Sequence, residues 1–131
     1  MSDRMLEKSN FDDEDLEQYD RSLAKEAVRV VQDIKFGVET AEVSNILENN
    51  DSIAYINLRT LEKKDFCIEL TVSGYRIVSN RFDTIDEDFL ENNRLYKNTK
   101  FESYESLMNE ISQLFIKKFN DSVAERLNSI E

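Results

Sequence analysis

A cluster of acidic side chains between residues 83 and 88 has a composition that could bind a divalent cation. Asp83, Asp86, Glu87 and Asp88 lie close together in the chain, and carboxylate oxygens are ligands that Ca²⁺ prefers. The calcium loop of helix-loop-helix proteins also has a central glycine and acidic residues at alternating positions, and this segment has neither. Because runs of charge are typical of solvated surfaces, the sequence predicts no metal site here.

The chain holds few of the side chains that catalyse reactions. It contains no histidine, which excludes Ser-His-Asp and Cys-His arrangements and any histidine metal ligand. Gly37 and Gly74 stand apart from each other, so no glycine-rich phosphate-binding loop is present. Cys67 lies between apolar residues of an expected strand, where a packing role is typical. We therefore predict a protein that is not an enzyme and that requires no cofactor.

The composition also narrows the class of partner. The 131 residues carry a net charge of −11, from 28 acidic and 17 basic side chains, and lysine pairs such as Lys63-Lys64 are isolated. That charge opposes phosphate backbones and anionic headgroups, so neither nucleic acid nor membrane is an expected partner. A single cysteine fits a reducing compartment, and the first residues lack the apolar stretch of a signal peptide. We expect a cytoplasmic protein, with access to the nucleus left open.

Apolar periodicity predicts an α+β fold, with one domain over residues 22–131 after an acidic, disordered tail at 1–21. Apolar residues at intervals of three and four predict a long amphipathic helix over residues 22–47. Residues 52–82 alternate apolar and polar side chains between short turns, which predicts an antiparallel meander of three strands. Because one face of the meander must be covered, we expect the first helix and the C-terminal helices to pack on it.

The last expected helix, residues 112–130, carries apolar side chains on more than one side. Ser112 can cap its start, and we expect Leu114 and Phe115 to face the protein's own core. Four apolar residues form a stripe along one face of the second half: Phe119, Val123, Leu127 and Ile130. Chain ends are usually polar, so two interpretations stay open. Either the stripe completes the core, or it is offered to a partner.

Several short segments follow the pattern of one known family. They are Val30-Val31, Asp33, Phe36 and Val38, then Ala54-Tyr55-Ile56-Asn57, Cys67-Ile68-Glu69-Leu70-Thr71 and Gly74, then Phe82-Asp83, Phe119 and Arg126-Leu127. In order, and nearly in spacing, these segments resemble the glycogen synthase kinase-3 interaction protein family over about residues 26–131. A related domain occurs near the N-terminus of the much larger clustered mitochondria proteins, whereas the length of this chain is similar to that of the stand-alone adaptors.

The resemblance implies a non-enzymatic adaptor that binds glycogen synthase kinase-3 through its C-terminal helix. The helix is also similar to the kinase-binding helix of axin, which fills a groove on the C-terminal lobe of the kinase. Such an adaptor would restrain or localise the kinase in Wnt/β-catenin-type signalling. The kinase-binding residues that the resemblance implies are Phe119, Val123, Leu127 and Ile130 as the apolar face and Arg126 as a flanking polar contact.

The family's second implied activity is anchoring of protein kinase A through its regulatory subunit. The face that the resemblance implies lies on the first helix and includes Val31, Lys35 and Val38. Anchoring members carry leucine where this chain has Lys35. A charged group in a desolvated groove costs several kcal/mol unless its stem lets the ammonium reach water. The sequence therefore disfavours this activity, and a purely structural interaction domain remains the other alternative.

Overall fold

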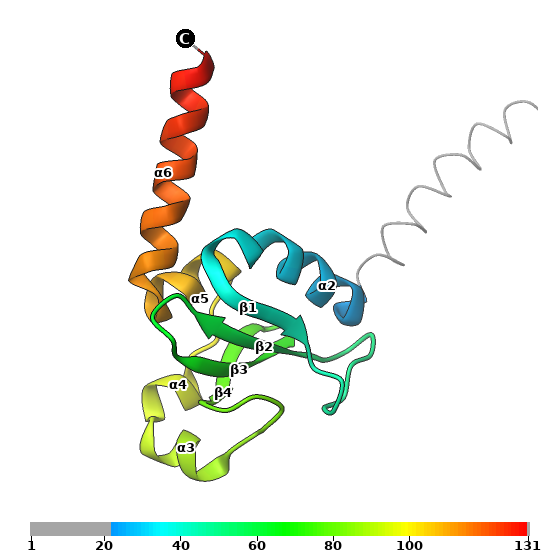
Figure 1. Ribbon diagram of the computed structural model, residues 1–131. Helices are drawn as coiled ribbons and strands as arrows, with labels where there is room; N and C mark the ends of the chain where they lie inside the picture. The colour runs from blue at the N-terminus through cyan, green and yellow to red at the C-terminus, as the bar shows by residue number, and fades with distance from the viewer. Residues whose placement is uncertain (1–21, 131) are drawn as a thin grey trace, which may run out of the picture.

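A computed structural model of the protein describes residues 22–130, so the expected acidic tail at 1–21 lies outside the described residues (Figure 1). A four-stranded antiparallel sheet in the order β1-β2-β3-β4 forms the centre, and helices flank it, which confirms the α+β class. The elements in chain order are α2 (Leu23–Ile34), η1 (Lys35–Gly37), β1 (Val38–Val43), β2 (Ala54–Thr60), β3 (Asp65–Thr71), β4 (Gly74–Ser79), α3 (Glu87–Asn92), α4 (Arg94–Asn98), α5 (Tyr104–Ile111) and α6 (Gln113–Ile130).

The main core lies between one face of the sheet and helices α2 and α5. Alternate residues of β2 such as Ile56 and Leu58 point into this core, where they meet Val30 of α2 and Met108 of α5. Their alternation follows directly from the two-residue period of a strand. A smaller cluster of Tyr55, Cys67 and Val78 lies on the opposite face, partly covered by the segment that follows β1.

The first helix is shorter than expected, and the sheet has one more strand. Helix α2 ends at Ile34 rather than near residue 47, and after the short turn of η1 the chain forms β1. Val38 and Ala41 of β1 are both buried although they are three residues apart, because the strand register shifts between Val38 and Thr40. This spacing imitates a helical period, so the prediction of a continuous helix 22–47 and of a three-stranded sheet was wrong.

The residues between β4 and α5 form two short helices rather than an irregular loop. Leu90 of α3 is buried, and the rings of Phe89 and Tyr96 stack with their centroids 6.3 Å apart, which joins α3 to α4. Leu95 of α4, in contrast, is 69% exposed. It therefore provides a surface leucine that is remote in the chain from α6.

Candidate docking helix

The last helix has a buried beginning and a projecting end. In Figure 1, α6 leaves the sheet and the other helices and extends alone toward the C-terminus. Phe115 is fully buried and Phe119 is half-buried, whereas Val123 is 36% exposed and Leu127 is 60% exposed. We call residues 120–130 the projecting half of α6. The side chain of Ile130 lies outside the described residues.

The apolar stripe of α6 continues a series of residues that begins at the core. Ser112, which precedes the helix, Ile116 and Phe119 follow intervals of four and three and are buried or half-buried, and the same series continues through Val123 and Leu127. The inward face of the helix thus runs on past the end of the protein's own core. The exposed apolar stripe is the part of this face that nothing in residues 22–127 covers.

Three phenylalanines fix the beginning of α6 to η1. The ring centroids of Phe36 and Phe115 are 5.3 Å apart, those of Phe36 and Phe119 are 6.4 Å apart, and those of Phe115 and Phe119 are 6.5 Å apart. We call these residues the aromatic cluster. Gly37 packs closely against the ring of Phe115: an added Cβ at this position would lie 2.5 Å from a ring carbon. The helix therefore leaves the domain at a defined place.

A carboxylate from the β2–β3 turn caps the N-terminus of α6. The Ser112 hydroxyl donates a hydrogen bond of 2.8 Å to Glu62, and the N–H of Leu114 donates one of 2.9 Å to the other oxygen. Ser112 accepts in turn from the N–H of Phe115 at 3.1 Å, which confirms its predicted capping role. Burial raises the pKa of Glu62, but these hydrogen bonds outweigh it and hold the pKa below its ordinary value. Glu62 was not among the sequence-predicted site residues, because its partners are 50 and 52 residues away in the chain.

Replacing Glu62 with glutamine is expected to lower the free energy of unfolding by about 1 kcal/mol at neutral pH, the typical effect of losing a helix cap. Because the folded pKa is lower than the unfolded one, the contribution is present above the unfolded pKa of about 4.3 and is lost as the pH falls through the folded pKa. Urea denaturation at neutral and at acidic pH measures the free energy of unfolding of both proteins. The Glu110→Gln variant, at an exposed position of α5, is the control. If the free energies of unfolding of wild type and Glu62→Gln differed by the same amount at both pH values, the capping role would be contradicted.

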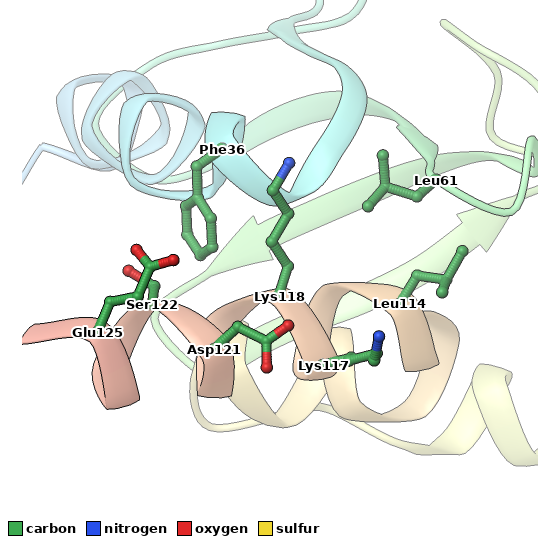
Figure 2. Close-up of a pocket in the computed structure, with 8 residues that line it drawn as sticks. All are labelled: Phe36, Leu61, Leu114, Lys117, Lys118, Asp121, Ser122 and Glu125. Atoms are coloured by element: carbon green, nitrogen blue, oxygen red, sulfur yellow. The ribbon is translucent and has the colours of Figure 1, made fainter. Parts of the chain in front are cut away.

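Leu114 does not face the core as expected. It is 44% exposed and lies with Phe36 and Leu61 in a groove of about 540 Å³ between α6 and the neighbouring turn (Figure 2). Charged side chains of α6 complete the lining, among them Lys118 and Asp121. The prediction for Leu114 was wrong because the hairpin turn reaches α6 through Glu62 and leaves the leucine at the edge.

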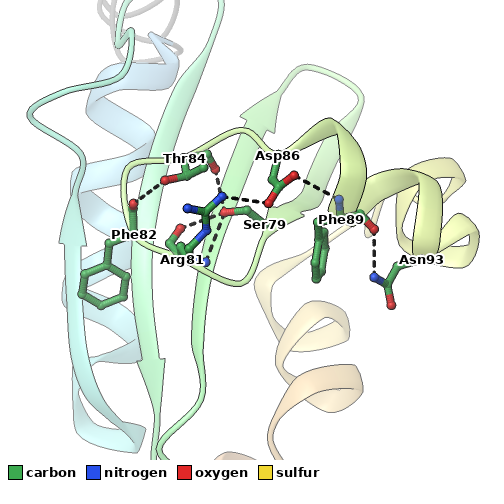
Figure 3. Close-up of polar contacts among 7 residues, drawn as sticks. All are labelled: Ser79, Arg81, Phe82, Thr84, Asp86, Phe89 and Asn93. Atoms are coloured by element: carbon green, nitrogen blue, oxygen red, sulfur yellow. Dashed lines mark hydrogen bonds and ion pairs between the residues drawn. The ribbon is translucent and has the colours of Figure 1, made fainter.

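The acidic cluster after β4 fixes the local backbone. Asp86 accepts a hydrogen bond of 3.1 Å from the N–H of Phe89, which caps α3, and its other oxygen pairs with Arg81 at 2.9 Å (Figure 3). Asp83 accepts from the side-chain amide of Asn57 at 2.7 Å and from a serine hydroxyl, and these bonds lower its pKa. Within the described residues, no three acidic or cysteine side chains are placed to hold a metal ion.

Cys67 has the packing role that its sequence context predicts. It is fully buried, and burial raises the pKa of its thiol to about 11. A thiol of that pKa is protonated at neutral pH and is a poor nucleophile. Over residues 22–130, no helix is long and apolar enough to cross a membrane.

The residues implied for the protein kinase A regulatory subunit do not form one helical face. Val31 of α2 is buried in the core, Val38 lies in β1 and is also buried, and only Lys35 in η1 is exposed. The expected helical face was wrong because the helix ends before Val38. Anchoring of the regulatory subunit, which Lys35 already disfavours in the sequence, stays an untested implication of the resemblance.

The architecture is that of an α+β domain that presents one amphipathic helix to solvent. Residues 23–130 match the GSKIP domain family, and the chain belongs to this family. It is 32% identical over 111 residues to the GSK3B-interacting protein of Bos taurus, covering 85% of this chain and 75% of that protein. It is 32% identical over 118 residues to the GSK3-beta interaction protein of Gallus gallus, covering 89% and 80%. A Drosophila melanogaster protein, the GSKIP homolog, is 34% identical over 95 residues, covering 72% and 76%.

Proposed function

We propose that this protein is a non-enzymatic adaptor that binds glycogen synthase kinase-3 through α6 and thereby restrains or localises the kinase. The names of the vertebrate relatives describe an interaction with this kinase. The observation that carries the proposal is the projecting half of α6, where Val123 and Leu127 are exposed on the continuation of a buried face. Contiguous apolar surface of this kind marks a protein-binding site.

Helix-in-groove recognition fits the spacing of the stripe. Phe119, Val123 and Leu127 stand at i, i+4 and i+8 on α6, so they form one ridge that an apolar groove can accept. Burying an exposed leucine side chain contributes about 1.5–3 kcal/mol. Arg126 is exposed beside the ridge and would supply the flanking polar contact. Ile130, which the resemblance also implies, follows Leu127 by three positions in the sequence.

An axin-like mode of binding would give the adaptor its effect on signalling. A helix that occupies the axin groove of the kinase excludes axin from it, so axin-dependent substrates would be phosphorylated less. The rest of the domain, which α6 leaves at the aromatic cluster, would hold the kinase in a complex. Neither step needs a catalytic group from this chain.

Removal of residues 121–131 is expected to abolish capture of the kinase and to leave the domain folded. The shortened chain keeps Phe115 and Phe119, which hold α6 on η1, whereas a truncation after Ser112 would remove the buried Phe115 and confuse binding with unfolding. A pull-down with purified kinase measures binding, and thermal unfolding checks the fold. Normal capture by a folded, shortened chain would refute the proposal.

A further inference from the structure

The direction of the stripe restricts how a partner can reach it. The stripe continues the inward face of α6. It therefore lies on the same side of the helix as the place where α6 leaves the domain (Figure 1). At that place η1 is the neighbouring element, and its Phe36 contacts Phe115 and Phe119 of the helix. A partner that covers the stripe down to Phe119 therefore approaches η1 as well.

Phe36 is unusually exposed for a phenylalanine within an aromatic cluster. The residue is 41% exposed although its ring contacts both Phe115 and Phe119. Figure 2 shows the ring directed from η1 toward α6, near Ser122. Phe36, Phe119 and Val123 are each partly exposed, and Phe119 links the other two, because its ring contacts Phe36 and it precedes Val123 by about one helical turn. Aromatic side chains at the centre of such patches are frequent hot spots of binding.

Phe119 itself cannot supply a free anchor. Its ring stacks on Phe115 with an interplanar angle of 12°, and Phe115 is fully buried. Withdrawing Phe119 into a partner's groove would break this contact and expose the aromatic cluster to water. Phe119 is half-buried, and the ring of Phe36 lies beside it with the centroids 6.4 Å apart. The domain therefore offers the two rings together.

We propose that glycogen synthase kinase-3 docks on a composite surface, made of the apolar stripe of α6 and of Phe36 in η1. This inference rests on the proposed function and adds a residue outside the helix to its interface. Phe36 enlarges the apolar contact at the beginning of the stripe, where Phe119 is half-covered. The fold of the domain, and not the helix alone, then determines the affinity.

Site-specific photo-crosslinking in the full-length chain tests this contact directly. A benzophenone amino acid is placed at position 36, at position 127 or at position 85, and each protein is irradiated with purified kinase. Ile85 is the matched control, because its exposed fraction of 41% equals that of Phe36 and it lies between β4 and α3, outside the groove that Phe36 lines with α6. We expect crosslinks from positions 36 and 127 and none from position 85.

Affinity measurements complete the test. Phe36→Ala is expected to weaken kinase binding about tenfold, while Ile85→Ala changes it less than about twofold. A crosslink from position 127 without one from position 36 would overturn the composite surface and leave the proposed function intact. Crosslinks of equal yield from position 85 would overturn it as well. The proposed function itself fails if position 127 gives no crosslink and if the chain without residues 121–131 still captures the kinase. Should Phe36→Ala unfold, the crosslinks still decide the question.

Discussion

Replacing Leu127 with aspartate is expected to weaken the binding of glycogen synthase kinase-3 at least about a hundredfold. Leu127 lies in the projecting half of α6 and is 60% exposed, more than Val123 at 36%. Aspartate removes the apolar contact and places a charge where the partner's groove would be desolvated. The free energy of unfolding is expected to change by less than about 0.5 kcal/mol, because Leu127 is exposed and belongs to neither hydrophobic cluster of the described residues.

Titration of the kinase by calorimetry or biolayer interferometry gives the dissociation constants. Leu95→Asp is the matched control. It is the same chemical change at another exposed leucine, because Leu95 is 69% exposed on α4 and is remote in the chain from α6. Leu127→Met should retain most of the affinity, because it preserves volume and apolar character. Equal losses in Leu127→Asp and Leu95→Asp would show a general effect of charge, and would remove Leu127 from the interface.

Gly37→Ala is expected to lower the free energy of unfolding by about 2 kcal/mol, the usual range for overpacking a well-filled core. Elsewhere a change from glycine to alanine stabilises a protein by about 0.4–1 kcal/mol when the backbone permits it, so the sign of the effect is diagnostic. Here the added Cβ would lie 2.5 Å from one ring carbon of Phe115 and 2.9 Å from another. Phe115 is fully buried and cannot move aside without disturbing the base of α6.

A double-mutant cycle with Phe115→Leu isolates this clash. Each single variant is expected to be destabilised, Gly37→Ala by overlap and Phe115→Leu by a cavity. The smaller leucine leaves room for the new methyl group, so the double variant should be more stable than the sum of the two effects predicts, by at least about 1 kcal/mol. Urea denaturation measures all four proteins. If the two losses in the free energy of unfolding simply added up, the effect of Gly37→Ala would not come from a clash with Phe115.

Much of the sheet followed from local pattern. Residues of β2, β3 and β4 alternate as strands do, and each pair of neighbours is joined by a short turn, so their antiparallel order was predictable. The strand β1 was not, because its register shift puts Val38 and Ala41 on one face at a helical interval. Gly37 gave a signal that the helix ends there, since glycine is unfavourable inside a helix.

The candidate site divides in the same way. The stripe from Phe119 to Leu127 was predictable, because residues at intervals of three and four share a face of any helix. The division of these residues into buried and exposed ones was not predictable. Phe119 packs on Phe36, whereas Leu127 is exposed to solvent. Leu114 is at the surface although it directly precedes the buried Phe115. These differences depend on where η1 and the β2–β3 turn meet α6.

The sequence by itself determined which chemistry the chain can perform and which helix face is apolar, because residue types and helical period are local properties. It contains no histidine, and its last helix carries one stripe that reaches beyond residue 119. Only the tertiary structure decided how much of that stripe the protein uses for its own core. Phe36, Gly37 and Glu62 meet the beginning of α6 from segments distant in the chain and bury it as far as Phe119. Beyond that point Val123 and Leu127 of α6 are exposed, and this exposed part is the surface on which we propose that the kinase binds.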